Sequence, residues 1–345
     1  MLAKLENAGI RGTARNWLAT YLSDRTQVVD YNSVISPKAP ISYGVVQGSI
    51  LGPILFLVYI NDLTSLFKPN QCFLYADDTT LYFESDCATK LVSGINELLD
   101  KAYTWFNSNR VSVNHSKCKY MFFNCNQKDL PPVVLGREQL LEVQTFKFLG
   151  LIIDNRLTFK NHMESLLLRC KTSLTILSIL KHLVSENCIK LVYFAFFQSI
   201  IEYCCEIFGH RSQGFFARID RTQNKAIKIM FGSNCNVERA LKSNNILRFK
   251  ELVRRKTSLF MFDVYHASLP KRLQSLFVCN RDVLCRSSKF SNNFKVQSCS
   301  THVLSTSLSL SGVRLWNSLP TEIKNTNVRH QFKNLILLFY FITLP

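Results

Sequence analysis

Hydrophobic and polar positions follow two different spacings along the chain, and the change falls near residue 160. Before it, short runs rich in β-branched and aromatic residues alternate with helical patterns, the clearest of which covers Leu91 to Phe106. From about His162 to about residue 267 helical spacing dominates, and the run Leu191 to Ile207 predicts a buried amphipathic helix. The pattern therefore predicts an α/β region followed by a mostly helical one.

Within the first region the spacing predicts two short helices before residue 23 and a buried helix over Gly52 to Phe67, where Pro53 is tolerated in the first turn. Short strands are expected at Gln27 to Val34, Ile41 to Val46, Val111 to Val113, Tyr120 to Phe123, Val133 to Leu135 and Phe148 to Ile153. Near the other end, Val278 to Ser311 is rich in Ser, Asn and Cys and has weak periodicity. We expect a loosely ordered linker there.

The segment Cys72 to Phe83 carries the first candidate chemistry. Aromatic and β-branched residues alternate on both sides of Asp77 and Asp78, which predicts a hairpin with two carboxylates at its tip. Such a pair taken alone is usually only a turn former. Crowded carboxylates repel unless a cation lies between them, and hard oxygen ligands select Mg²⁺ or Mn²⁺. A metal site at this tip is therefore the sharper hypothesis.

The net charge of +18 is distributed unevenly. Residues 1–85 hold 6 basic and 7 acidic side chains, whereas residues 211–345 hold 22 basic and 6 acidic ones. A strongly basic segment favours a polyanionic partner such as nucleic acid, with an anionic membrane surface as the weaker alternative. The basic third of the chain, and not the chain as a whole, therefore predicts the binding of nucleic acid.

Cysteine usage and apolar runs exclude several classes of protein. The 12 cysteines include no CxxC pair and no zinc-ligand spacing, which favours a reducing compartment over a disulfide scaffold. The first residues lack the apolar core of a signal peptide, and the runs Ile50 to Ile60 and Leu335 to Leu344 are too short to span a bilayer. We expect an intracellular protein of the nucleus or cytoplasm that is neither secreted nor a partner of membranes.

Four blocks of residues then point to one family, because they occur together and in order. The blocks are Gly44–Phe56 with Tyr59–Leu63, Phe73–Asp78 (FLYADD), Trp105 with Asn114–Lys117, and Phe148–Gly150 with Asp154, Leu157 and His162. They resemble the template-gripping block, the YxDD box and the two following blocks of the reverse transcriptases of non-LTR (LINE-type, jockey-like) retrotransposons. The stretch Gly312–Pro320 (GVRLWNSLP) also resembles the C-terminal tail of such elements.

The resemblance implies catalytic roles for three residues. Asp77 would be a metal ligand, and Asp78 would assist the placement of the metal or shape the tip. Lys117 would face the departing pyrophosphate as a cation or proton donor; a solvated lysine on a strand edge is the alternative. The family reaction is the attack of a primer 3′-hydroxyl on a deoxynucleoside triphosphate, with two Mg²⁺ (or Mn²⁺) ions as cofactors.

The resemblance also implies contacts with an RNA template, a DNA primer and deoxynucleoside triphosphates. Template and nucleotide would lie against the loop of Gln47, Gly48 and Ser49, where the absence of a side chain at Gly48 allows close approach, and near Tyr75. The alternative for this loop is an ordinary turn between strand and helix. Phe148, Leu149 and Gly150 would place a hairpin against the primer, although Phe148 is equally consistent with simple core packing.

Two departures from the family pattern matter. Val46 stands where the family usually has Pro, so the template loop is expected to be less rigid. The family's first catalytic Asp belongs to a block that would precede this sequence, since no Asp occurs before Asp24. We therefore expect an N-terminally truncated reverse transcriptase that is inactive by itself.

The helical region supplies candidate phosphate contacts. Arg218, Arg221, Lys225 and Lys228 fall on one face of a predicted helix, and neutralisation of phosphates by such a face needs no sequence readout. A solvated charged face is the alternative for any single cluster.

We expect a partial right-hand polymerase palm of α/β (α+β) class at residues 1–165, a helical thumb or connection at 166–275, and a linker with a basic tail at 276–345. A non-catalytic nucleic-acid binder derived from a transposon is the rival function, and a chain that does not fold stably is the third hypothesis.

Overall fold

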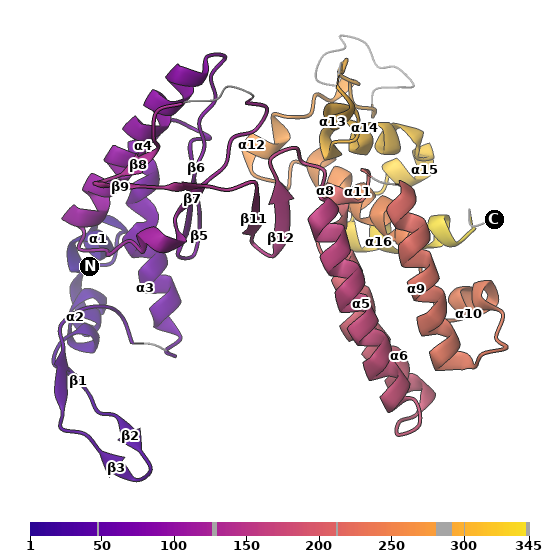
Figure 1. The fold of residues 1–345 in the computed structure, drawn as a ribbon, viewed down its shortest axis with the longest axis horizontal. Helices are drawn as coiled ribbons and strands as arrows, with labels where there is room; N and C mark the ends of the chain where they lie inside the picture. Colours follow the sequence, from indigo (N-terminus) through magenta and orange to yellow (C-terminus); the bar gives the residue numbers. More distant parts are fainter. Residues whose placement is uncertain (47, 126–129, 212, 281–291, 300, 343–345) are drawn as a thin grey trace. The chain divides into compact units, whose positions relative to one another are not determined.

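The structure is a computed structural model of the 345-residue chain. It describes all residues except 47, 126–129, 212, 281–291, 300 and 343–345. The described chain forms two compact units, Met1–Val143 and Gln144–Pro345, and each is described by itself (Figure 1). Both helices and strands are present, so the expected mixed α/β (α+β) class is confirmed at that level.

The first unit contains helices and five strand pairs. Its helices are α1 (Leu2–Asn7), α2 (Gly12–Leu22), α3 (Leu51–Ile60), the 3₁₀ turn η1 (Asn61–Leu66), α4 (Ala88–Ser108) and the 3₁₀ turn η2 (His115–Lys117). Its strands are β1 (Arg25–Gln27), β2 (Asp30–Tyr31), β3 (Val34–Ile35), β4 (Ala39–Ile41), β5 (Cys72–Tyr75), β6 (Asp78–Leu81), β7 (Lys119–Tyr120), β8 (Val134–Leu135), β9 (Glu138–Gln139) and β10 (Leu141–Glu142). The pairs β1–β4, β2–β3, β5–β6 and β8–β9 are antiparallel, and β7–β10 is parallel.

Helix α4 organises the core of this unit, and it confirms the helix expected over Leu91 to Phe106. Two apolar clusters use it, one with α3, η1 and β5 and one with the segment around β8. Gly94 permits one of these contacts, because a Cβ there would lie 2.3 Å from Cζ of the Phe83 ring. The helix therefore packs against residues of the hairpin β5–β6 and of the segment that follows it.

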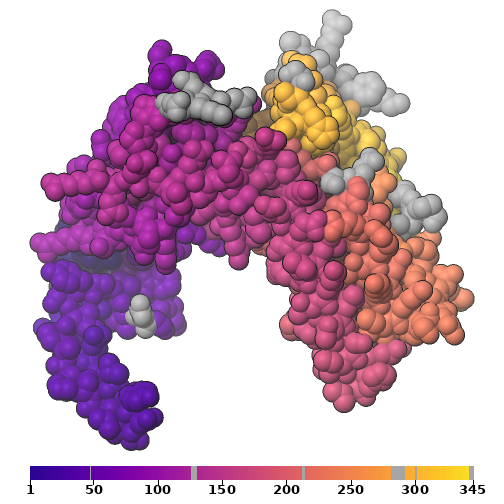
Figure 2. All heavy atoms as spheres, viewed as in Figure 1, coloured from indigo at the N-terminus to yellow at the C-terminus, as the bar shows by residue number. Residues whose placement is uncertain are grey.

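The first strands differ from the expected ones. The chain reverses inside the strand expected at Gln27 to Val34, because Asn32 and Ser33 adopt positive φ of 50° and 65°. Asn tolerates this conformation better than most residues. No strand forms at Val111 to Val113, and the described residues of Ile41 to Val46 are extended only as far as Ile41. The resulting β1–β4 arm carries exposed apolar side chains and projects from the first unit at the lower left of Figure 2.

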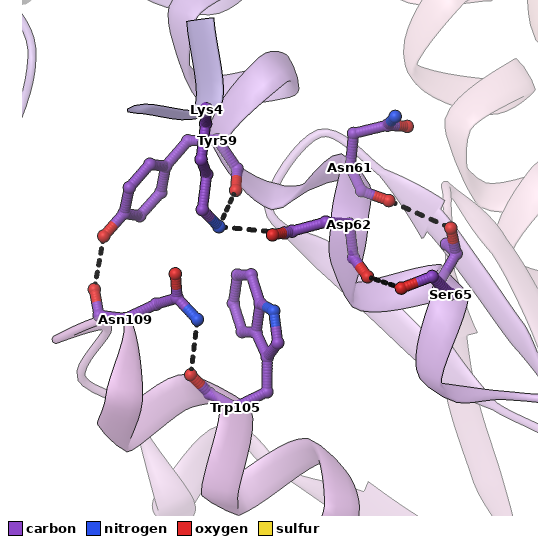
Figure 3. A network of polar contacts seen from close by, with 8 residues as sticks. Lys4, Tyr59, Asn61, Asp62, Ser65, Trp105 and Asn109 are labelled. Atoms are coloured by element: carbon purple, nitrogen blue, oxygen red, sulfur yellow. Dashed lines mark hydrogen bonds and ion pairs between the residues drawn. The ribbon is translucent and has the colours of Figure 1, made fainter. Parts of the chain in front are cut away.

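A partly buried lysine joins the start of the first unit to its centre (Figure 3). Nζ of Lys4 donates to the carbonyl oxygen of Tyr59 at 2.7 Å and to Oδ1 of Asp62 at 2.8 Å. The same nitrogen lies 4.4 Å from the ring centroids of Tyr59 and Trp105. The Tyr59 hydroxyl in turn donates to the carbonyl of Asn109 at the end of α4. One ammonium group thus connects α1, α3, η1 and α4.

The second unit is a hairpin followed by helices. The hairpin strands are β11 (Thr145–Phe148) and β12 (Leu151–Asp154). The helices are α5 (Lys160–Leu180), α6 (Glu186–Tyr193), the π-helical turn η3 (Phe194–Gln198), α7 (Ser199–Glu202), α8 (Cys205–Phe208), α9 (Gln213–Phe231), α10 (Val237–Ser243), α11 (Phe249–Tyr265), α12 (Lys271–Gln274), α13 (His302–Ser305), α14 (Leu308–Ser318), α15 (Thr321–Lys324) and α16 (Arg329–Ile342). Helices α5 and α9 lie side by side, and α11 packs against α14 and α16 (Figure 1).

Two expectations in this unit are wrong. The helix expected over Leu191 to Ile207 is interrupted, because Tyr203 leaves the helical conformation and Cys204 has φ of 53°. The strand expected at Phe148 to Ile153 is two strands, since Leu149 and Gly150 form a turn with φ of 45° and 89°. Both interruptions give the chain a reversal that periodicity alone does not reveal.

Part of the linker expected near Val278 to Ser311 packs against the core, whereas residues 295–298 and 301–304 are exposed. Cys279 and Phe294 are buried in the core and form a β-bridge. Phe294 donates its N–H to Oδ1 of Asn317 at 2.9 Å, and Nδ2 of Asn317 donates back to the carbonyl of Phe294 at 2.8 Å. Residues 281–291 lie outside the described residues. Palm, thumb and tail are functional subdomains, whereas the two compact units are defined by packing. The expected division of the chain at residues 165 and 275 therefore stays a prediction.

The stretch Gly312–Pro320 accounts for part of this packing. The Trp316 ring is fully buried, lies 5.3 Å from that of Tyr265, and donates from Nε1 to the carbonyl of Asn292 at 3.0 Å. Gly312 allows α14 to approach α11, because a Cβ there would lie 2.9 Å from Sδ of Met261. The motif therefore packs α14 closely against α11 in the second unit.

Candidate functional site

The hairpin β5–β6 presents the two carboxylates. Tyr75 pairs with Asp78, so Ala76 and Asp77 are the two residues of the turn. Ala76 has φ of 52°, as the primed turns of two-residue hairpins require. Asp77 and Asp78 are both exposed, and the expected hairpin with two carboxylates at its tip is confirmed.

Alternation along β5 explains why the tip stays fixed. Cys72 is buried and Leu74 packs against the α4 cluster, whereas Phe73 and Tyr75 face solvent, with 66% of Tyr75 exposed. The inward residues hold the hairpin on the core of the first unit. The outward face therefore offers an aromatic ring beside the carboxylates.

The chemistry of this tip fits a hard divalent cation. Carboxylate oxygens are ligands that Mg²⁺ and Mn²⁺ prefer, and both carboxylates are accessible. Across the described ranges no group of three or more His, Cys, Asp or Glu residues gathers in a way that could hold a metal ion. The pair supplies ligands for part of a coordination shell.

The loop before α3 is shaped by glycines and one serine. Gly44 and Gly48 have φ of 79° and 78°. Oγ of Ser49 donates to the carbonyl of Val46 at 2.7 Å and accepts from the N–H of Gly52 at 3.0 Å. A Cβ on Gly48 would meet nothing within 4 Å, so its backbone is open to approach from outside. Gln47 lies outside the described residues.

Lys117 ends the 3₁₀ turn η2 and is exposed. Its backbone N–H donates to the carbonyl of Asn114 at 3.1 Å, which holds the turn. Among the described residues no ion pair uses its ammonium group. The side chain is therefore available to an anion.

The second unit carries the remaining candidates. The turn of the hairpin β11–β12 consists of Leu149 and Gly150, and Phe148 precedes it with its side chain half-buried. The hydroxyl of Tyr203 donates to the carbonyl of Leu149. Sequence reasoning missed Tyr203, which lies 54 residues further along the chain.

Helix α9 confirms the predicted amphipathic pattern. Arg218, Arg221, Lys225 and Lys228 are exposed, whereas Ile219 and other apolar residues of the helix are buried. Arg218 forms two hydrogen bonds to the Glu164 carboxylate of α5, one of them 2.7 Å long from Nη2 to Oε2. This contact raises the pKa of Arg218 and lowers that of Glu164. One of the four cations is thus already compensated within the protein, which the sequence pattern did not reveal.

Tyr75, Asp77 and Asp78 are therefore brought together on one hairpin. The loop 44–50 and Lys117 belong to the same unit, although no described contact joins them to that hairpin. Phe148–Gly150 and the cations of α9 belong to the second unit.

Comparison with known proteins finds a family model that matches part of the chain. Residues 2–153 match the family model described as reverse transcriptase (RNA-dependent DNA polymerase). The match includes the carboxylate hairpin, the loop 44–50, Lys117 and the turn Leu149–Gly150, and it ends before α9. The resemblance found in the sequence is therefore confirmed.

Three curated relatives from Drosophila melanogaster extend the likeness. The chain is 27% identical over 223 residues to the probable RNA-directed DNA polymerase from transposon X-element, covering 62% of this chain and 24% of the relative. It is 25% identical over 280 residues to the RNA-directed DNA polymerase from mobile element jockey, covering 76% and 30%. It is 28% identical over 274 residues to the probable RNA-directed DNA polymerase from transposon BS, covering 74% and 30%. The chain thus spans about a quarter to a third of the length of these relatives.

Among the described helices, none is both long and apolar enough to cross a bilayer.

Proposed function

We propose that the chain is part of the RNA-directed DNA polymerase of a non-LTR retrotransposon and contributes the carboxylate hairpin of its active site. The observation that carries this proposal is the exposed pair Asp77 and Asp78 at the hairpin tip, inside a segment that matches the reverse transcriptase family. Its substrates are an RNA template, a DNA primer and deoxynucleoside triphosphates.

In this proposal Asp77, at the turn, and Asp78, at the start of β6, would hold divalent cations through their carboxylate oxygens. Bound Mg²⁺ or Mn²⁺ would stabilise the attacking and leaving oxygens of an in-line displacement. Tyr75, exposed on the same face, packs against the nucleotide or the end of the primer. The hairpin thus positions charge and an apolar surface next to the reacting phosphate.

Other residues of the first unit bind the polyanionic substrates. The loop of Gln47, Gly48 and Ser49 lies against template and nucleotide, and the open space beside Gly48 leaves its backbone accessible. Lys117, exposed and without an ion pair among the described residues, neutralises the departing pyrophosphate. In the second unit, Phe148, Leu149 and Gly150 contact the primer.

The 345-residue chain is expected not to extend a primer unaided. Two carboxylates supply only part of the ligands for two divalent ions. We infer that the remaining ligands come from another part of a longer polypeptide like those of the relatives, of which this chain spans about a quarter to a third. Joining the corresponding upstream segment of the jockey polymerase to this chain should therefore give activity.

A second candidate function is the binding of nucleic acid without catalysis. It is favoured by α9, where Arg221, Lys225 and Lys228 are exposed and form no ion pair among the described residues. Neutralising these three residues should weaken RNA binding and lessen its dependence on salt. Unchanged affinity after the substitutions would contradict a role for α9.

Primer extension on an RNA template with Mg²⁺ tests the proposed function. The joined protein should extend the primer, and Asp77→Asn should lower the rate by at least about 100-fold, because a metal ligand is lost. Asp86→Asn is the matched control, since Asp86 is an exposed carboxylate a few residues beyond the hairpin. Activity that survives Asp77→Asn would show that this hairpin is not the metal site.

A further inference from the structure

The hairpin β11–β12 has a turn whose direction the strands alone do not fix. Its four paired positions end at Phe148 and Leu151, and the turn residues Leu149 and Gly150 both have positive φ. A short two-stranded hairpin is marginally stable in water without support from other elements. Contacts outside the hairpin must therefore hold the turn in place.

The base of the hairpin has such contacts. The Asp154 carboxylate accepts hydrogen bonds from the backbone N–H groups of Arg156, Thr158 and Phe159, at 3.1, 3.0 and 2.6 Å. Nδ1 of His162 on α5 accepts from the N–H of Ile152 at 3.3 Å. These bonds fix β12 to the start of α5 and leave the turn to be held separately.

Tyr203 is the side chain that reaches the turn. Its hydroxyl donates to the carbonyl of Leu149. Its ring covers Gly150, where a Cβ would lie 3.3 Å from Cε1 and 3.5 Å from the hydroxyl oxygen. Glycine at this position thus serves the close approach of the ring as well as the positive φ of 89°.

The break in the helical run explains how Tyr203 comes to this place. Helix α7 ends at Glu202, Tyr203 has ψ of 118°, and Cys204 has φ of 53° before α8 begins. The neighbours Ile201 and Cys205 are fully buried, so both sides of the break are held in the core. In an uninterrupted helix the direction of residue 203 would be set by the helical turn. Because the helix breaks here, the Tyr203 side chain instead points toward the hairpin.

We propose that Tyr203 is a positioning residue that holds the Leu149–Gly150 turn in the conformation that contacts the primer strand. This inference rests on the proposed function, because it takes the hairpin as the primer contact. Tyr203 acts through the turn: its hydroxyl donates to the Leu149 carbonyl, and its ring lies against Gly150.

Hydrogen exchange of the whole 345-residue chain tests the anchor without any need for catalysis. Tyr203→Phe keeps the ring and removes the hydroxyl, and it should speed exchange of the peptide covering 145–154 by about 5- to 10-fold, the loss expected for one hydrogen bond. Tyr265→Phe is the matched control, because it removes a phenol donor to Oδ1 of Asn292 in the same unit. Exchange in α9 should stay the same in both variants, which shows that the unit remains folded.

Photo-crosslinking tests the link to the primer. A template–primer with a photoreactive nucleotide at the primer 3′ end should cross-link to the peptide 145–154, and Tyr203→Phe should reduce this yield several-fold while total affinity stays within about twofold. Tyr265→Phe should leave the yield unchanged.

The two readouts separate this inference from the proposed function. Unchanged exchange at 145–154 in Tyr203→Phe would overturn Tyr203 as the anchor. Faster exchange with an unchanged cross-link would overturn its role toward the primer. If the unsubstituted chain cross-linked outside the peptide 145–154, the hairpin would not contact the primer, and the role of Tyr203 would be refuted. The assignment as part of a polymerase could still hold in that case.

Discussion

The partly buried ammonium of Lys4 gives the sharpest stability prediction. Lys4→Met keeps an unbranched apolar stem of similar length and removes the charge. The change removes the hydrogen bonds to the Tyr59 carbonyl and to Asp62, at 2.7 and 2.8 Å, and the cation–π interactions with the rings of Tyr59 and Trp105. Only 17% of the Lys4 side chain is exposed, so water cannot fully replace these partners.

The expected cost follows from the contacts. A hydrogen bond to a charged group contributes about 1.5–3 kcal/mol, and a cation over an aromatic face about 0.5–1 kcal/mol. Desolvation of the ammonium offsets part of this, and half of Asp62 is exposed, with 51% of its side chain accessible. We therefore expect Lys4→Met to lower the free energy of unfolding of the first unit by ~2–3 kcal/mol.

Urea denaturation measures this loss, and hydrogen exchange of residues 1–22 locates it. Lys101→Met is the matched control, because Lys101 pairs with Glu97 at 2.7 Å on the exposed face of α4, where solvent screens the pair. The control should leave the urea midpoint almost unchanged. If Lys4→Met shifted the midpoint no more than Lys101→Met, the reasoning from burial and aromatic contacts would be refuted.

Three further predictions concern packing and pH. Gly94→Ala should destabilise the first unit by ~1–3 kcal/mol in urea unfolding, because the added Cβ clashes with Phe83. Gly214→Ala is the control, since a Cβ there meets nothing within 4 Å, and it should leave stability equal or slightly higher. Equal effects of the two substitutions would contradict the packing argument. Burial and the charge of Arg169 lower the pKa of His162 to about 4, so the unfolded chain takes up a proton that the folded chain does not, and stability should fall as pH drops from about 6.5 to 4. Burial and Arg254 lower the pKa of His210 to about 4 as well, so His162→Asn should lessen this fall in pH-dependent urea midpoints without abolishing it. Trp316→Ala should cost ~3–5 kcal/mol and speed hydrogen exchange in α11, and unaltered exchange there would contradict the packing role of the C-terminal motif.

Local patterns in the sequence predicted the elements that depend on local physics. Alternation on both sides of Asp77 was enough to predict the carboxylate hairpin, and helical spacing was enough for α4 and for the exposed face of α9. These features follow from strand and helix periodicity, which neighbouring residues set.

Contacts between distant residues could not be predicted in this way. Lys4 meets Asp62, Arg218 meets Glu164, and Tyr203 meets Leu149, over separations of 58, 54 and 54 residues. The break at Tyr203 and Cys204 was missed for a related reason, since an apolar run looks the same whether its helix continues or reverses. What the sequence could not supply is therefore tertiary pairing, and this pairing determines which charges stay available to a ligand.

Primer extension by this chain, joined to the upstream segment of the jockey polymerase, tests the central claim most directly. The account predicts Mg²⁺-dependent DNA synthesis on an RNA template that falls by at least about 100-fold in Asp77→Asn and persists in Asp86→Asn. Absence of synthesis by the joined protein, or synthesis that Asp77→Asn leaves intact, would contradict it.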